Sequence, residues 1–209
     1  MRELEQKRAI EKKEIARIMA AYLQSRGKEA HLSEESNFDS CGGKTKESVI
    51  ALIDDNINEI RLLNTFYELS DNAYRFDYNI ITDRPFTPDL KKAMNVRSKV
   101  VKANKQIGLF GGDVVDITWS GNELAEKLNG DTELSKLVVE SINNGGTADI
   151  RILAVLPSTV EILGPAFIGS LLTDSAEQNR VIKIFGLEIY SRIAGHIREL
   201  IVSLTSQMV

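Results

Sequence analysis

The sequence predicts an α/β fold in which a mainly parallel sheet of four to five strands is covered by helices. From about residue 74 to the end, strand patterns alternate with helix patterns, and this order is typical of a parallel sheet. Short apolar segments rich in branched residues, such as 149–156 (DIRILAVL), are typical of buried strands. The composition, with 43% hydrophobic and 27% charged residues, is that of a globular protein and excludes disorder over the whole chain.

The N-terminal region, residues 1–70, is predicted to contain two long helices joined by a polar loop over 28–45. The first helix, over 3–26, has an apolar stripe with helical spacing: Ile15, Ile18, Met19, Tyr22 and Leu23. The second, over about 46–69, has a stripe with the same period: Val49, Ile53, Ile57, Ile60 and Leu63. Because such helices must bury their apolar faces, we expect them to pack on each other or on a second subunit.

Residues 71–209 are predicted to form the α/β domain, with strands near 76–82, 113–118, 149–156 and 180–185. Aromatic and polar residues alternate in 74–82 (YRFDYNIIT), as they do in a half-buried strand. Residues that favour helix N-caps precede the expected helices: Thr87, Ser120, Asp131 and Ser158. We expect Gly164-Pro165 to interrupt the helix after Ser158, and the last helix to cover 187–206.

A candidate ligand site follows from this arrangement. In a parallel sheet, the helix N-termini that follow successive strands lie along one edge, where each offers free N–H groups and about half a positive charge. Such an edge suits an anionic small molecule. Arg84 lies in the first of these loops and adds a fixed charge. The candidate ligand-binding residues are Arg84, Thr87, Ser120, Asn122 and Ser158.

Residues that often carry catalysis or bind metals form no complete motif. Cys41 is the single cysteine, so no disulfide can form within the chain and a reducing compartment is expected. Asp113 and Asp116 lie three apart in an expected strand and therefore point to opposite faces, which argues against a metal site. His196, in the last helix, is expected to be a partly buried histidine with its hydrogen bonds satisfied. We expect no cofactor and no metal.

Charge and hydropathy bear on location and partners. The net charge of −4 and the pI of about 5.4 make nucleic-acid binding unexpected. The longest apolar stretch, Val160–Leu172, has about 13 residues and is too short to span a bilayer, so we expect a cytoplasmic protein with no membrane contact. A homodimer is expected because the N-terminal helix offers one apolar stripe and the last helix has a seam of alternating three and four spacings: Leu187, Tyr190, Ala194, Ile197, Ile201 and Leu204. Burial of this helix within its own domain is the alternative.

Residues 113–157 resemble phospholipase-D-like modules. The resemblance lies in 115–121 (VDITWSG), a helix pattern with two glycines in 133–146 (ELSKLVVESINNGG), and 149–157 (DIRILAVLP). The catalytic signature of that family, His-x-Lys followed by Asp, is missing from this chain. The resemblance therefore implies a fold of that type without its hydrolytic activity, as in some sensor or regulator domains.

The function that these patterns favour is that of a non-enzymatic regulatory or ligand-sensing protein that self-associates and binds an anionic small molecule. One alternative is an enzyme acting on a small phosphorylated or nucleotide substrate, with candidate residues Asp83, Arg84, Asp113, Asp116 and Glu123. A second alternative is a DNA-binding regulator that uses residues 1–70, although the acidic pI argues against it.

Overall fold

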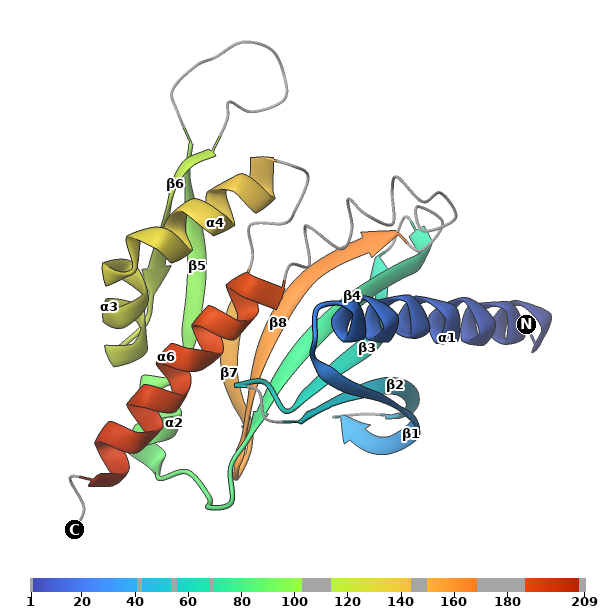
Figure 1. Cartoon of the computed structure of the whole chain (residues 1–209), viewed down its shortest axis with the longest axis horizontal. Helices are drawn as coiled ribbons and strands as arrows, with labels where there is room; N and C mark the ends of the chain where they lie inside the picture. The colour runs from blue at the N-terminus through green and yellow to red at the C-terminus, as the bar shows by residue number, and fades with distance from the viewer. Residues whose placement is uncertain are drawn as a thin grey trace.

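A computed structural model of the chain describes residues 2–40, 43–53, 56–67, 70–102, 114–143, 150–168 and 187–206. Its helices are α1 (Arg2–Ser25), α2 (Pro88–Ala93), α3 (Glu123–Gly130), α4 (Thr132–Asn143) and α6 (Leu187–Ser206). Its strands are β1 (Glu29–Ser40), β2 (Gly43–Ile53), β3 (Glu59–Tyr67), β4 (Ser70–Ile81), β5 (Val96–Lys102), β6 (Val114–Ser120), β7 (Arg151–Leu156) and β8 (Thr159–Ile168). Within the described residues these strands form one eight-stranded sheet, in the order β1-β2-β3-β4-β8-β7-β5-β6 (Figure 1).

The predicted mainly parallel sheet of four to five strands is wrong, because every neighbouring pair in the sheet is antiparallel. The error is clearest after β7, where the chain makes a turn at Pro157 and Ser158 and returns directly as β8. The segment beginning at Ser158 was predicted to open a helix. Its β-branched residues Thr159, Val160 and Ile162 favour a strand instead.

The N-terminal region is only partly as predicted. The helix expected over 3–26 is present as α1, but the helix expected over 46–69 is wrong, since these residues belong to β2 and β3. The polar loop expected over 28–45 is also wrong, because β1 and the start of β2 occupy it. Burial at every second position favours strands over a helix here. Ile50 and Leu52 of β2 and Ile60 and Leu62 of β3 are all buried on one face.

Several predicted elements are confirmed. The strands expected near 76–82, 113–118 and 149–156 correspond to β4, β6 and β7, and the last helix corresponds to α6. Thr87 caps α2 by accepting a hydrogen bond from the Leu90 N–H, and Asp131 caps α4 in the same way through Leu134. The helix expected to open at Ser120 begins at Glu123, with Asn122 at the N-cap position. The strand expected near 180–185 lies outside the described residues.

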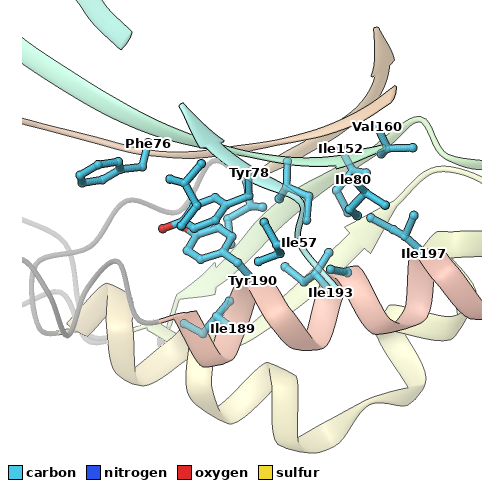
Figure 2. Packing of buried hydrophobic residues seen from close by; sticks show 14 of the residues in the cluster. Ile57, Phe76, Tyr78, Ile80, Ile152, Val160, Ile189, Tyr190, Ile193 and Ile197 are labelled. Carbon is cyan, nitrogen blue, oxygen red and sulfur yellow. The ribbon is translucent and has the colours of Figure 1, made fainter. Parts of the chain in front are cut away.

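The sheet has one apolar face, and the long helices pack on it. Figure 1 shows α1, α3, α4 and α6 on the same side of the sheet. On this side α6 contributes Tyr190, Ile193 and Ile197, which lie among buried side chains of β4, β7 and β8 (Figure 2). The rings of Tyr78 and Tyr190 stack with 3.9 Å between their centroids and 9° between their planes. Burial of this apolar surface against the helices is the main source of stability for the fold.

A glycine in β8 permits the packing around this tyrosine pair. A Cβ atom on Gly164 would overlap the carbonyl oxygen of Phe76 and lie 3.2 Å from the ring of Tyr78. Gly164-Pro165, which was expected to interrupt a helix, therefore lies within β8, where the register with β4 shifts between Arg75 and Asp77. A bulge of this kind often marks a close approach of two backbones.

The outer edge of β6, at one end of the sheet, is hydrogen-bonded to two asparagine side chains. Asn129 Oδ1 accepts from the Trp119 N–H at 2.8 Å, and Asn129 Nδ2 donates to the Trp119 carbonyl at 2.9 Å. Asn143 makes the same pair of bonds with Val114, at 3.0 and 2.9 Å. Each asparagine thus satisfies both backbone groups of one strand residue.

The seam predicted for self-association on α6 is largely used inside the chain. Tyr190, Ala194 and Ile197 are buried in the core, and Ile201 and Leu204 pack against it. The alternative of a helix buried in its own domain thus accounts for most of the stripe, and the homodimer stays a prediction. Among the helices that the structure describes, none combines the length and the hydropathy that a membrane span requires.

Candidate functional site

A group of charged and polar residues lies on the face of the sheet opposite the helices. We call this group the polar sheet face; its members are Glu59, Arg61, Arg75, Asp77 and Asn79. They occupy alternating positions of β3 and β4, where Arg61 pairs in register with Asp77 and Glu59 with Asn79. Tyr78, between Asp77 and Asn79, points to the helix-covered face and stacks on α6.

The charges of the polar sheet face are arranged in close pairs. Arg75 donates from Nε and Nη2 to the two carboxylate oxygens of Asp77, both at 2.6 Å, and Asp77 is fully buried. Arg61 Nη2 donates to Glu59 Oε2 at 3.1 Å. A bidentate arginine–carboxylate pair is among the strongest side-chain hydrogen bonds in proteins. Burial, and to a smaller extent the charge of Asp77, raises the pKa of both Tyr78 and Tyr190 well above the ordinary value, so both stay neutral phenols.

Asn79 differs from its neighbours on this face. Its side chain is fully buried, and neither Nδ2 nor Oδ1 has a hydrogen-bond partner. Its cross-strand neighbours are Glu59 on β3 and Glu161 on β8. Leaving a buried donor or acceptor unpaired costs on the order of 1–3 kcal/mol. Trp119 Nε1 and Ser191 Oγ are also buried without a partner, but each is a single group, whereas Asn79 leaves both a donor and an acceptor unpaired.

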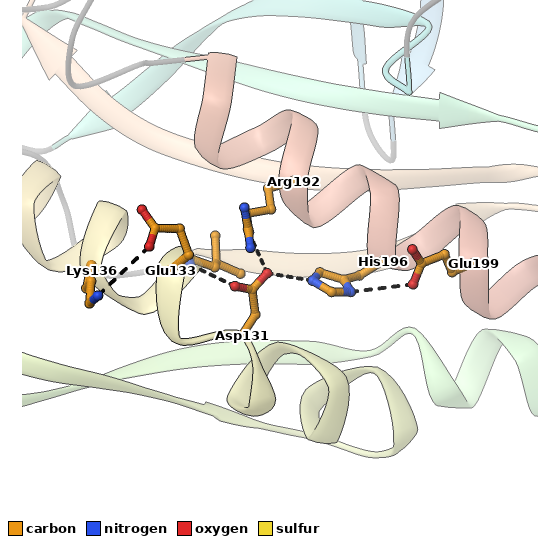
Figure 3. Close-up of polar contacts among 7 residues, drawn as sticks. Asp131, Glu133, Lys136, Arg192, His196 and Glu199 are labelled. Atoms are coloured by element: carbon orange, nitrogen blue, oxygen red, sulfur yellow. Dashed lines mark hydrogen bonds and ion pairs between the residues drawn. The ribbon is translucent and has the colours of Figure 1, made fainter.

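A second polar group joins the α3–α4 connection to α6 (Figure 3). We call it the helix junction; its members are Asp131, Arg192, His196 and Glu199. Asp131 Oδ2 accepts from Arg192 Nε at 2.5 Å and lies 2.7 Å from His196 Nε2. Asp131 Oδ1 accepts from the Leu134 N–H at 3.0 Å, which caps α4. One nearly buried carboxylate therefore ties the start of α4 to two turns of α6.

The charges of the helix junction stabilise the ionised form of Asp131 and hold the helices together. The hydrogen bond from Arg192, with smaller contributions from His196 and the Leu134 N–H, holds the pKa of Asp131 well below its usual range, although burial opposes the shift. The side chain of His196 is 22% exposed, and its second ring nitrogen lies 3.8 Å from Glu199 Oε2. This confirms the predicted partly buried histidine. His196 Nε2 is thus bound to Asp131, and the other ring nitrogen lies beside an exposed carboxylate.

The residues predicted to bind an anion do not form the expected site. β4, β6 and β7 run in the same direction, so Arg84, Ser120 and Ser158 follow strands that end at the same end of the sheet. The strands between them run the opposite way, however, so the row of helix N-termini that a parallel sheet provides is absent from the described part of the sheet. Ser158 lies in the turn before β8 and begins no helix.

The polar groups of these residues are mostly used within the fold. Thr87 Oγ1 accepts from the Leu90 N–H at 3.2 Å, and Ser120 Oγ donates to the Arg97 carbonyl at 3.1 Å. Asn122 Nδ2 donates to the carbonyl of Lys92 at the end of α2, at 2.9 Å. Arg84 and Ser158 come near each other through Thr82, whose hydroxyl bonds the Arg84 carbonyl at 2.9 Å and whose N–H bonds the Ser158 carbonyl at 2.9 Å. Arg84 itself is exposed.

The other residues of types that often carry catalysis or bind metals make only local contacts where the structure describes them. His31 Nε2 lies 3.4 Å from Glu29 Oε1, and both side chains are exposed. Asp116, on β6, accepts a hydrogen bond from the N–H of its neighbour Ile117, while Asp113 and Cys41 lie outside the described residues. Over the described parts of the chain, no three His, Cys, Asp or Glu residues come together in a way that could hold a metal ion.

Comparison with known proteins gives no relative from which a function could be transferred: no family model, no curated protein and no solved structure matches this chain. The resemblance of residues 113–157 to phospholipase-D-like modules therefore stays a prediction. A function for this chain is therefore inferred from the geometry of the polar sheet face and the helix junction.

Proposed function

We propose that this chain is a non-enzymatic ligand-binding protein and that it holds a polar ligand at Asn79 on the polar sheet face. The observation that carries the proposal is the fully buried carboxamide of Asn79, whose donor and acceptor are both unpaired. Nearly all buried polar groups in folded proteins have a hydrogen-bond partner. A ligand that accepts from Nδ2 and donates to Oδ1 would supply the missing partners.

The effect of Asn79 on the stability of the protein supports a role in binding. An apolar side chain of similar size, such as leucine, would remove two unpaired polar atoms from the interior and stabilise the protein. Polar residues that lower stability in this way are typical of binding sites, where function opposes stability. The asparagine at position 79 is therefore better explained by recognition than by folding.

The chemistry of the polar sheet face favours binding over catalysis. A carboxamide does not exchange protons near neutral pH, so Asn79 can position a ligand but cannot act as a general acid or base. The nearest ionisable side chains of β4, Arg75 and Asp77, form a closed bidentate pair. The helix junction likewise uses Asp131 to hold helices together. These arrangements suit a rigid recognition surface.

The test compares Asn79→Leu with the wild-type protein. We expect Asn79→Leu to raise the free energy of unfolding of the unliganded protein by about 1–2 kcal/mol, measured by urea denaturation. Native mass spectrometry of the freshly purified proteins should show a bound compound in the wild type and none in the variant. Asn129→Leu is the matched control, because that carboxamide has both partners on Trp119, and it should lower stability.

A lower stability of Asn79→Leu would overturn the proposal. It would mean that the carboxamide already has partners in the protein in solution, such as a bound water, and contributes to folding. Equal stability together with no bound compound in the wild-type protein would also count against a ligand at this position.

A further inference from the structure

The unpaired carboxamide also indicates the class of ligand. We propose that Asn79 binds the backbone of an extended peptide segment, by pairing with the N–H and C=O of a single residue. This inference rests on the proposed function and specifies the ligand for the same site.

The strongest support comes from two other asparagines of this chain. Asn129 and Asn143 each bind one residue of β6 through two hydrogen bonds, with Oδ1 accepting from its N–H and Nδ2 donating to its carbonyl. The four distances range from 2.8 to 3.0 Å. The side-chain carboxamide of asparagine therefore binds an extended backbone at two places in this fold.

The geometry of an extended strand explains why this pairing works. The N–H and C=O of one residue in a strand point to the same side, so a carboxamide can meet both at once. Asn79 offers the same two atoms, and both are without a partner. Its position within a strand of a rigid antiparallel sheet fixes the direction in which the carboxamide points.

The charges around Asn79 suit a neutral polar group. Arg75 is paired with Asp77 and Arg61 with Glu59, so these four charges cancel in two close pairs, and Glu161 on β8 adds a carboxylate at the position opposite Asn79. An anionic ligand gains nothing in such surroundings, whereas a peptide group carries no net charge. This balance argues against the anionic ligand that the sequence alone predicts.

Access to Asn79 leads past long side chains. The side chains of Glu59 and Arg75 stand on the same face and are 27% and 30% exposed, so each reaches solvent. Arg75 is held by its two bonds to Asp77, whereas Glu59 has a single hydrogen bond to Arg61, so a binding peptide would move Glu59 aside to reach the carboxamide. The edge of a nucleobase, such as adenine, can also pair with a carboxamide through a donor and an acceptor. Adenosine therefore serves as the competing probe.

The experiment titrates three probes into wild-type protein and Asn79→Leu, with binding followed by NMR chemical shifts of the β3 and β4 amides. The probes are a capped trialanine peptide, the same peptide with one amide N–H at a time replaced by an ester oxygen, and adenosine. We expect the capped peptide to bind the wild type in a saturable manner. At least one ester analogue and the Asn79→Leu variant should each weaken binding at least tenfold, since each removes one partner of a paired hydrogen bond.

The outcomes separate this inference from the proposed function. If the capped peptide does not bind while Asn79→Leu is more stable than the wild type, the peptide class is wrong and the proposed binding function stands. If adenosine binds and the peptide does not, the ligand class is a nucleobase and the inference is overturned. Peptide binding that is unchanged by Asn79→Leu, or by the ester replacement at every position, would also overturn it.

Discussion

Two regions of the molecule bury polar side chains, and they differ in whether the buried groups have partners. In the helix junction, Asp131 accepts three hydrogen bonds from two helices, and each of its oxygens is used. On the polar sheet face, Asp77 is equally well paired, but Asn79 two residues later has no partner for either side-chain atom. Paired buried groups hold elements together, whereas an unpaired one lowers stability and points to a ligand.

The largest effect is expected from breaking the buried ion pair beside Asn79. Asp77→Ala should lower the free energy of unfolding by about 3 kcal/mol, because it leaves the Arg75 guanidinium without its bidentate partner in a partly buried site. Urea denaturation measures the loss. The double variant Arg75→Met with Asp77→Leu should recover most of it, since no charge is then left unpaired. A double variant as unstable as Asp77→Ala would contradict this account.

Removing the central carboxylate of the helix junction should have a smaller but clear effect. Asp131→Ala is expected to cost about 2 kcal/mol, because it removes the cap of α4 and the bonds to Arg192 and His196. The side chain of Arg192 is 44% exposed, so solvent can replace part of its contribution. Thermal melting gives the comparison with Glu133→Ala, an exposed neighbour in the same turn, which should change stability very little. Equal losses from the two variants would contradict a clamp at Asp131.

The same carboxylate should make stability depend on pH in the acid range. The pKa of Asp131 is lower in the folded protein than in the unfolded chain, so its contribution is present above the unfolded value of about 3.9 and is lost as the pH falls below it. The stability difference between wild type and Asp131→Asn should therefore shrink as the pH falls below 4. Urea titrations at each pH measure it. A difference that stays constant down to pH 3 would show that Asp131 is not preferentially ionised in the folded state.

The smallest effect is expected at the outer end of the helix junction. Glu199 lies 3.8 Å from His196 and its side chain is 69% exposed, which is typical of a weak surface ion pair. Glu199→Gln should therefore change the free energy of unfolding by less than about 0.5 kcal/mol. A loss near that of Asp131→Ala, measured in the same urea series, would mean that the histidine is held from both sides.

The elements that the sequence predicts correctly are those with a single strong pattern. The stripe of α1 and the alternation in β4 each fit one period only, and the branched run in β7 is too short for a helix between Gly145-Gly146 and Pro157. Residues 46–69 fit two periods, because the run from Val49 to Ile53 is apolar at every position and satisfies either a helix or a strand. Long-range pairing with β1 and β4 selects the strand, and this information is not local.

The candidate site was missed for a related reason. Alternation in 74–82 marks the polar residues as the solvent side of a strand, yet Asp77 and Asn79 are fully buried. The register neighbours of Asn79 are Glu59 on β3 and Glu161 on β8, and the local pattern of β4 does not show which residues these are. Asp131 was recognised as a helix cap from local sequence, but its contacts with Arg192 and His196 span more than sixty positions and have no sequence signature.

The asparagine-bound edge of β6 has a consequence for how this protein can associate. An open strand edge is a template on which further chains can add, and this is a common route to aggregation and domain swapping. Asn129 and Asn143 take the positions that the backbone of an added strand would take, so growth of the sheet at β6 must first displace them. These two side chains therefore block the addition of further strands to the sheet at this edge.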